Sequence, residues 1–219
     1  MALARLSYIK DKLLLGLTST THDNSLKLAL EMATQEIEGE NGFTARTLTS
    51  TAYTDKIITR NESSMMDNRL YPIEWPVTAV SKLEFWDTST EDYVEETATY
   101  YQVIDERWID YPKLGQETNA TYSTFPKGQN RIRITYTAGY VTTNWATLAV
   151  TEAFAVPRDL EHAVGVIATL QWLDGQGGDS RLGISSVSNG VESYATQPYI
   201  DGYPKEIYDA LKRYRRKSI

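Results

Sequence analysis

Apolar residues near the start of the chain recur at steps of three and four, the spacing of an amphipathic helix. Residues 3–14 therefore predict a short first helix that ends near Gly16. Residues 24–40 predict a second helix, for which Asp23 or Asn24 supplies the amino-terminal cap. Together the two segments predict a helical hairpin.

The same spacing returns in the last third of the chain. Residues 157–174 predict the main core helix, with Pro157 in its first turn and an apolar stripe along one side. The stripe comprises Leu160, Val164, Ile167, Leu170 and Leu173. The glycine-rich residues 175–178 predict a flexible linker after this helix, and residues 204–216 predict a final amphipathic helix.

Between these helical regions the chain is rich in threonine, tyrosine and isoleucine, which favour β-strands. The predicted strands are residues 44–53, 56–60, 77–86, 93–104, 108–111 and 131–140. Residues 131–136 alternate strictly between polar and apolar, so one face of their sheet is expected to be apolar and the other wet. Residues 184–194 predict a late hairpin with a tight two-residue turn at Asn189-Gly190.

These elements predict an α+β fold, a helical bundle with a β-rich middle insertion and a late β-hairpin. The bundle has two amino-terminal helices, a long core helix and a carboxy-terminal helix. The predicted parts are residues 1–42 for the helical hairpin, 43–141 for the β-rich unit, 142–183 for the core helix and glycine linker, and 184–219 for the late hairpin and basic terminal helix.

Composition narrows the class of protein. A chain of 219 residues with 41% hydrophobic residues can bury a real core, and it lacks cysteine for thiolate metal sites or disulfides. The two histidines, His22 and His162, belong to no recognisable catalytic motif. The apolar runs are too short to span a membrane, and the first residues lack a signal-peptide stretch. We therefore expect no enzymatic activity, no cofactor, no metal and no membrane passage.

Charge is distributed unevenly around a formal sum of -7. From residue 205 to the end, six cations face two carboxylates, a local charge of +4, whereas residues 86–124 carry nine carboxylates and two cations, a local charge of -7. This pattern predicts two contact surfaces of opposite sign. The alternative is a solvated acidic face together with ordinary cations at a helix end, where the helix dipole favours them.

Aromatic residues are the other compositional signal. The chain has 15 tyrosines and five tryptophans, and such rings suit interfaces because they bury a large area while keeping a polar tip. Exposed Trp75, Trp86 or Trp108 on a β-rich unit would also suit a carbohydrate-binding module. That class of binding protein is the less favoured alternative.

Several segments, taken together, resemble the head-to-tail connector (adaptor) proteins of tailed bacteriophages. The most specific combination is Thr-Tyr-Thr-Ala-Gly-Tyr at residues 135–140, followed by Pro-Arg-Asp-Leu at 157–160 and a helix that reaches Trp172. Further similar segments are residues 23–43, 71–80, 125–134 and 203–216. The long β-rich middle and residues 142–155 depart from compact members of the family.

The resemblance implies a structural protein of the virion neck, made in the cytoplasm of the host bacterium. Such a protein forms a ring of identical subunits, usually a dodecamer, beneath the portal protein. The ring offers a platform to a tail-side neck or tail protein, and double-stranded DNA passes through it transiently without specific binding. The nearest competing role is that of another phage neck or tail-completion protein.

Two groups of site residues follow from the resemblance and the charge pattern. The predicted portal-binding residues are Tyr203, Ile207, Tyr208, Leu211, Arg213, Tyr214, Arg215 and Arg216. Their apolar members are expected to anchor and their arginines to meet carboxylates; the alternative is a helix that folds back on its own core. The predicted acidic face of the DNA channel comprises Glu91, Asp92, Glu95, Glu96, Asp105 and Glu106, which would repel phosphate.

Overall fold

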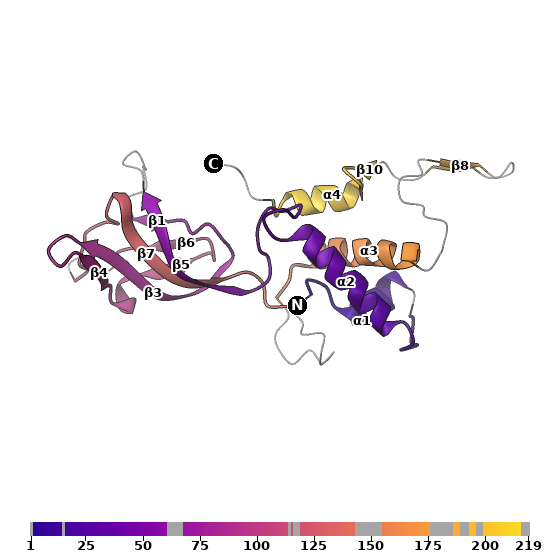
Figure 1. The fold of residues 1–219 in the computed structure, drawn as a ribbon, viewed down its shortest axis with the longest axis horizontal. Helices are drawn as coiled ribbons and strands as arrows, with labels where there is room; N and C mark the ends of the chain where they lie inside the picture. The colour runs from indigo at the N-terminus through magenta and orange to yellow at the C-terminus, as the bar shows by residue number, and fades with distance from the viewer. Residues whose placement is uncertain are drawn as a thin grey trace. The chain divides into compact units, whose positions relative to one another are not determined.

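The computed structural model divides the chain into two compact units. Met1–Thr49 and Val141–Ile219 form the first, here called the helical unit, and Ser50–Tyr140 form the second, here called the β unit (Figure 1). The structure describes residues 2–14, 16–60, 68–113, 115, 119–142, 155–175, 186–188, 193–195 and 199–215. The chain therefore enters the β unit once, leaves it once and completes the helical unit afterwards.

The helical unit begins with one turn of α-helix, α1 (Leu6–Tyr8), which continues as a wider π-helical turn, η1 (Ile9–Leu13). α2 (Asp23–Ile37) follows. The predicted cap is wrong, because α2 begins at Asp23 and has no side-chain cap at His22. The Asp23 carboxylate instead accepts a hydrogen bond from Lys10 Nζ at 2.8 Å and ties α2 to η1.

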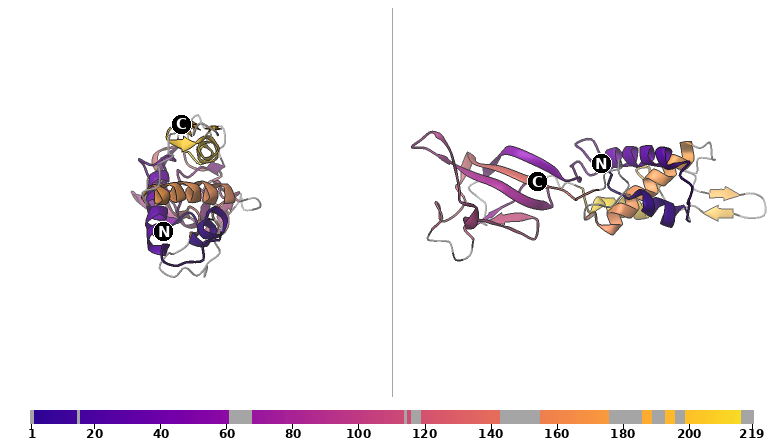
Figure 2. Two further views of the ribbon diagram at one scale, coloured as in Figure 1. Left: turned by 90° about the vertical axis from the view of Figure 1, so that its right-hand side faces the viewer. Right: turned by 90° about the horizontal axis from the view of Figure 1, so that it is seen from below.

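α3 (Arg158–Gly175) is the predicted core helix. It crosses α2, as Figure 1 shows from the front and Figure 2 from two further sides. The segment η1 approaches α3 closely at Gly165, where an added Cβ would lie 3.1 Å from a methyl carbon of Leu13. The predicted apolar stripe is wrong at its last position, because the side chain of Leu173 is 45% exposed near the end of the helix.

The carboxy-terminal segment folds back on the helical unit. The strands β10 (Tyr199–Ile200) and β11 (Tyr203–Pro204) pair around Asp201-Gly202, a two-residue turn with φ of 51° and 86°. α4 (Lys205–Lys212) follows at once and packs against α3. The last described turn, at residues 213–215, extends from the end of this helix.

The late hairpin is confirmed by the antiparallel pairing of β8 (Ser186–Ser188) with β9 (Ser193–Ala195). Ser188 pairs with Ser193, whereas a two-residue turn at Asn189-Gly190 would pair Ser188 with Val191, so the register differs from the predicted one. Asn189 and Gly190 lie outside the described residues, as do Gly177 and Gly178 of the predicted linker.

The β unit is built on a four-stranded antiparallel sheet in the order β1-β7-β3-β4. Its strands are β1 (Thr51–Arg60), β7 (Gly128–Ala138), β3 (Val77–Asp87) and β4 (Asp92–Glu95). Two predicted strands, at 44–53 and 56–60, prove to be one strand that starts later. Asp55 has a φ of 50° at the bulge between them and donates its backbone N–H to Thr135 Oγ1 at 3.1 Å.

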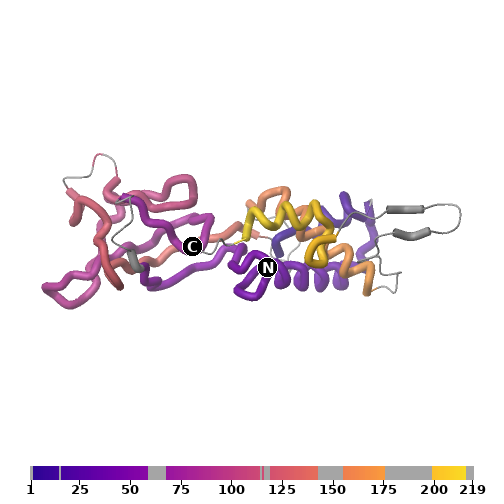
Figure 3. Tube along the Cα trace, turned by 90° about the horizontal axis from the view of Figure 1, so that it is seen from above, coloured from indigo at the N-terminus to yellow at the C-terminus, as the bar shows by residue number. Residues whose placement is uncertain are grey.

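A smaller sheet lies beside the first, in the order β2-β6-β5. It consists of β2 (Arg69–Leu70), β6 (Trp108–Asp110) and β5 (Gln102–Ile104). The predicted strand at 93–104 is wrong as a single element, because the 3-10 turn η2 (Ala98–Tyr100) separates β4 from β5. Figure 3 follows this course of the chain as a tube.

The two sheets enclose the core of the β unit. Along β7 the buried residues Ile132, Ile134 and Tyr136 alternate with half-exposed ones, which confirms the predicted apolar and wet faces. Phe85, Tyr111 and Phe125 pack with them, and the ring centroids of these three residues lie 5.0 to 6.2 Å apart. Aromatic residues thus fill the core of this unit, so only part of the tyrosine-rich composition remains for interfaces.

A buried ion pair fixes the amino terminus to α3. Glu161 is 1% exposed, and its carboxylate accepts hydrogen bonds from Arg5 Nε at 2.7 Å, Arg5 Nη2 at 2.9 Å and the Arg5 backbone N–H at 3.2 Å. The carboxylate raises the pKa of the Arg5 guanidinium through the side-chain hydrogen bonds. The Arg5 side chain keeps 37% exposure, so only the acidic partner is fully desolvated.

Removing either partner is expected to have unequal effects. Arg5→Met leaves a buried carboxylate without its guanidinium and should lower the free energy of unfolding by about 3 kcal/mol. Glu161→Gln leaves a guanidinium that water still reaches and should cost about 1 kcal/mol. The urea concentration at the unfolding midpoint measures both losses of stability, provided that the dependence of the unfolding free energy on urea is unchanged. Glu31→Gln, at an exposed position on α2, is the control. Equal losses from the two variants would contradict the assignment of Glu161 as the desolvated partner.

Candidate functional site

The predicted portal-binding residues divide into a buried and an exposed set. Ile207 is 4% exposed, Leu211 0% and Tyr214 8%, so these three side chains pack within the helical unit. In this conformation they offer a partner no surface, which is the alternative of a helix folded on its own core. The exposed cations lie beyond them at the end of α4. They are Lys212, Arg213 and Arg215, here called the basic end.

Polar contacts at both ends hold the carboxy-terminal segment in place. The Tyr203 hydroxyl donates a short hydrogen bond to Glu36 on α2, and burial together with this contact raises the pKa of Tyr203. At the other end, the Tyr214 hydroxyl donates to Asp159 Oδ1 at 2.7 Å. Tyr208 is half-buried with its ring 5.4 Å from the ring of Phe43.

The basic end is only lightly engaged by its own unit. Arg213 lies 3.6 Å from Asp159, but its side chain is 73% exposed. The Arg215 guanidinium lies 5.7 Å from the ring centroid of Phe43. Such surface contacts contribute little stability, so these cations are available to an acidic partner. Arg216, the remaining member of the predicted set, lies outside the described residues.

The predicted acidic face loses one member to the core. Glu96 is 3% exposed, and its carboxylate accepts hydrogen bonds from the Tyr111 hydroxyl at 2.5 Å and from the backbone N–H groups of Thr97 and Thr121 at 2.9 and 3.1 Å. Burial and this contact raise the pKa of Tyr111. Glu96 therefore holds the β unit together and cannot face a channel.

The other acidic residues form two separate groups. Glu91 and Asp92 are exposed at the turn between β3 and β4, and Glu95 is exposed at the far end of β4, whereas Asp105 and Glu106 form the turn between β5 and β6. The backbone carbonyl of Glu106 accepts from Val77 at the start of β3, the opposite end of that strand from the β3–β4 turn. At about 3.3 Å per residue, the ends of β3 are roughly 33 Å apart. The five residues therefore share no continuous face.

The β3–β4 turn is the denser of the two groups. It projects beyond the neighbouring strands in Figures 1 and 3. Asp87 lies directly opposite Asp92 in the strand pairing, and a lowered pKa keeps the Asp87 carboxyl charged through hydrogen bonds from the Ser89 backbone and hydroxyl. We call Asp87, Glu91, Asp92 and Glu95 the acidic hairpin.

Behind the acidic hairpin, the wet face of the sheet carries an ion cluster that the sequence did not predict. Glu84 has a side chain 2% exposed, and its carboxylate accepts from Arg133 Nε and Nη2, both at 2.7 Å, while Lys82 Nζ lies 2.8 Å away. The Arg133 guanidinium also lies 4.3 Å from the ring centroid of Tyr93. The alternation of 131–136 placed Arg133 on the wet face, but its pairing with Glu84 required the register of β3.

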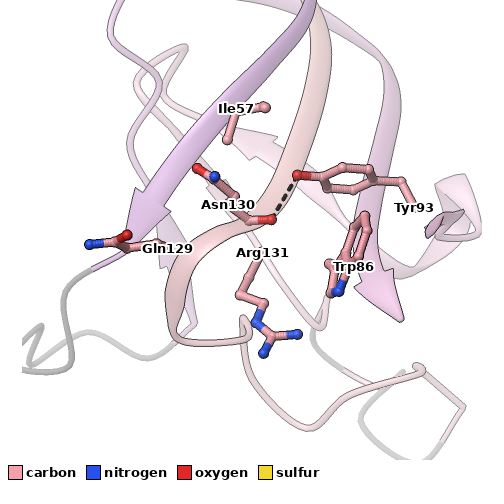
Figure 4. Close-up of a pocket in the computed structure, with 6 residues that line it drawn as sticks. All are labelled: Ile57, Trp86, Tyr93, Gln129, Asn130 and Arg131. Atoms are coloured by element: carbon pink, nitrogen blue, oxygen red, sulfur yellow. Dashed lines mark hydrogen bonds between the residues drawn. The ribbon is translucent and has the colours of Figure 1, made fainter. Parts of the chain in front are cut away.

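A pocket of about 370 Å³ lies beside this cluster, around the start of β7 (Figure 4). Its lining residues are Ile57, Trp86, Tyr93, Gln129, Asn130 and Arg131. Of the three tryptophans considered for carbohydrate binding, the structure places only Trp86 in this lining. Trp75 and Trp108 are half-buried elsewhere in the β unit.

Both histidines, the residues most often used in catalysis, contact aromatic side chains in the described part of the chain. His162 shares a hydrogen bond with the Tyr8 hydroxyl at 2.9 Å, and the His22 ring meets the ring of Trp172 at 5.5 Å. Over the described ranges, no three histidine or acidic side chains gather in a way that could hold a metal ion. No described helix combines the length and apolarity needed to cross a membrane.

Comparison with known proteins finds similar chains among solved structures. No protein-family model matches the chain, and no curated protein matches it. The chain is similar to one in the virion of a native gene transfer agent (GTA) particle, at 21% identity and a TM-score of 0.49 over 97% of this chain and 89% of that one. It is also similar to a chain in the neck of an empty GTA particle computed with C6 symmetry, at 19% identity and a TM-score of 0.48 over 93% and 85%. A third match is a chain in the neck of the native particle computed with C12 symmetry, at 17% identity and a TM-score of 0.44 over 98% and 89%.

The Glu84 cluster is expected to make the stability of the β unit depend on pH. Hydrogen bonds from Arg133 hold the pKa of Glu84 below its usual range, so its contribution is complete above the ordinary value of about 4.3 and is lost as the pH falls through the lower folded value. Glu84→Gln should therefore lose less stability than the unmodified protein between about pH 5 and pH 3. Urea unfolding across that range measures the difference.

The matched control for this prediction is Glu95→Gln, since Glu95 lies directly opposite Glu84 in the strand pairing but is exposed. This control should retain the acid sensitivity of the unmodified protein. If the stability of Glu84→Gln and of the unmodified protein fell in parallel as the pH is lowered, the Glu84 cluster would not contribute to the acid sensitivity of the β unit.

Proposed function

We propose that this chain is a non-enzymatic structural protein of the neck of a phage-type particle. In this role it is an adaptor that forms a ring of identical subunits, a dodecamer, beneath the portal and provides the platform for a tail-side protein. The segments that resemble connector proteins support the proposal. The structural observation that carries it is the presence of two charged surfaces of opposite sign, the basic end and the acidic hairpin, on two separate units of one chain.

Surfaces of this kind suit a structural ring. Subunits in a ring present different patches to their neighbours above, below and beside them, so one chain needs several distinct contact surfaces. A single exposed ion pair contributes only about 0.2–1 kcal/mol. Repetition around a ring multiplies such weak contacts, because all subunits engage together.

The basic end is the surface that we assign to the portal. Its three cations are exposed, and the buried neighbours Ile207, Leu211 and Tyr214 fix α4 on the helical unit beneath them. The contact is therefore electrostatic and supported by a rigid base. Deleting residues 203–219 would be a poor test, because it would remove core side chains together with the charges.

The acidic hairpin is the surface that we assign to the DNA path. Like charges directly opposite one another destabilise a strand pair, yet Asp87 faces Asp92 across β3 and β4. A charge arrangement that costs stability is reasonable where it serves another purpose. Repulsion of phosphate would keep DNA mobile within a ring, whereas DNA binding requires a basic and salt-sensitive surface.

Reversal of the basic end is expected to abolish attachment to the portal. The variant Lys212→Glu, Arg213→Glu and Arg215→Glu should keep its melting temperature within a few degrees, because these side chains are exposed. It should no longer co-sediment with portal-containing heads at moderate salt. Negative-stain imaging of the mixture shows whether a ring is present beneath the portal.

The matched control reverses three exposed lysines elsewhere, Lys12→Glu, Lys56→Glu and Lys113→Glu. This control changes the total charge by the same amount but leaves the basic end intact, so it should still bind heads. If both variants bind heads alike, the basic end is not the portal contact. Binding to tail-side components without binding to the portal would favour the competing role of a tail-completion protein.

Reversing the charge of the acidic hairpin is expected to raise the stability of the protein while impairing its function. Glu91→Lys with Asp92→Lys replaces the like-charged Asp87 and Asp92 pair by an opposite one and should raise stability by about 0.2–1 kcal/mol. The same variant should slow DNA release from assembled particles. Thermal melting and the rate of release measure the two effects.

The control for the hairpin variant is Glu31→Lys with Glu40→Lys, a matched change on the helical unit. Unchanged release kinetics in the hairpin variant would remove the DNA path from the proposal. Slowed release in both variants would show an effect of total charge instead of position.

A further inference from the structure

The pocket around the start of β7 lies on the wet face of the four-stranded sheet. Trp86 and Tyr93 are direct neighbours across β3 and β4, and Phe85, the residue before Trp86, points into the core. Ile57 from β1 is 49% exposed, although it is a large apolar side chain. Four strands thus contribute to one hollow of about 370 Å³, at the lower end of the range for small-molecule sites.

The aromatic wall of this pocket is held in a fixed orientation. The Tyr93 hydroxyl donates to the backbone carbonyl of Asn130 at 2.7 Å, as Figure 4 shows, and Arg133 covers the Tyr93 ring. The rings of Trp86 and Tyr93 meet nearly at right angles, with centroids 5.2 Å apart and an interplanar angle of 77°. Trp86 therefore has a supported position while it remains half-exposed at the pocket.

The polar part of the lining is unengaged within the described part of the chain. Gln129 and Asn130 are exposed, and their side-chain amides make no hydrogen bond there. The Arg131 guanidinium likewise makes no ion pair with a described residue, in contrast to Arg133 two positions later. Amide groups both donate and accept, and a guanidinium recognises a carboxylate through two parallel hydrogen bonds.

This combination fits a sugar ring that carries one carboxylate. A pyranose has an apolar face of C–H groups that an indole can cover, and a rim of hydroxyls that amides can bind. DNA fits poorly, because binding it needs several cations and Arg131 is the only cation among the described residues of the lining, in an acidic unit. An added peptide strand fits poorly too, because such strands bind at a sheet edge and this pocket lies on a face.

We propose that this pocket binds an acidic saccharide, with the sugar face on Trp86, the carboxylate on Arg131 and the hydroxyls on Gln129 and Asn130. The proposed ligand contacts use no residue of the basic end or of the acidic hairpin. It gives the β unit a second role, the recognition of a glycan that bears uronic-acid-type residues.

The experiment uses the full chain and saturation-transfer NMR with methyl β-D-glucuronide as the probe. A ligand of this size in a shallow site is expected to bind with a Kd of about 1 mM. Methyl β-D-glucoside, which lacks the carboxylate, should bind about tenfold more weakly, because it loses a charge-assisted hydrogen-bond pair. Acetate alone should show no saturable transfer, because it lacks the face that covers Trp86.

Variants assign the effect to the pocket. Trp86→Ala should abolish binding of the glucuronide, and Arg131→Gln should weaken it about tenfold while leaving the glucoside unchanged. Tyr71→Ala is the matched control, since Tyr71 is a 51% exposed aromatic residue of the same unit outside this pocket. Circular dichroism confirms that each variant is folded.

Three results would overturn the proposal. The first is no saturable transfer from the glucuronide up to about 20 mM, which is roughly twentyfold above the expected Kd. The second is undiminished binding by Trp86→Ala, and the third is equal binding of glucuronide and glucoside. Each of these outcomes leaves the neck function untouched, because no portal, head or DNA takes part in the assay. Failure of the portal test would likewise leave the glycan site standing.

Discussion

The alternation of side chains along β7 is the constraint on which the β unit depends. This central strand pairs with β1 on one side and β3 on the other, so every residue in it is fixed to one face. Its buried residues pack into the aromatic core, and the residues that alternate with them, among them Arg131 and Arg133, lie on the wet face. Slippage by one position would exchange the two faces and destroy the core, the ion cluster and the pocket together.

The helical unit uses its carboxy-terminal helix differently. α4 has only the length of about two turns, and helices this short are not stable alone in water. It is stable here because its apolar side chains are buried and Tyr203 and Tyr214 bind carboxylates on α2 and α3. The apolar face that a partner was expected to use is therefore occupied within the unit, and charge is what the helix still presents outward.

Charged residues have three distinct roles in this protein. Glu161, Glu84 and Glu96 are buried and bound by several donors, so they specify how segments fit together. The basic end is exposed and lightly engaged. The acidic hairpin concentrates like charges at a turn, against local stability. A count of net charge merges these roles, although only the last two are available for recognition.

The sequence by itself determined the class of fold, the core helix and the two faces of β7, because each depends on local periodicity that a single segment carries. It also found both charged regions. Only the tertiary structure decided that Glu96 is buried, that Asp105 lies far from Asp92, and that Leu211 packs inward, because those outcomes depend on which distant segments become neighbours. The pocket likewise needs the register of four strands, since its lining from Ile57 to Arg131 comes together through pairing that no local pattern encodes.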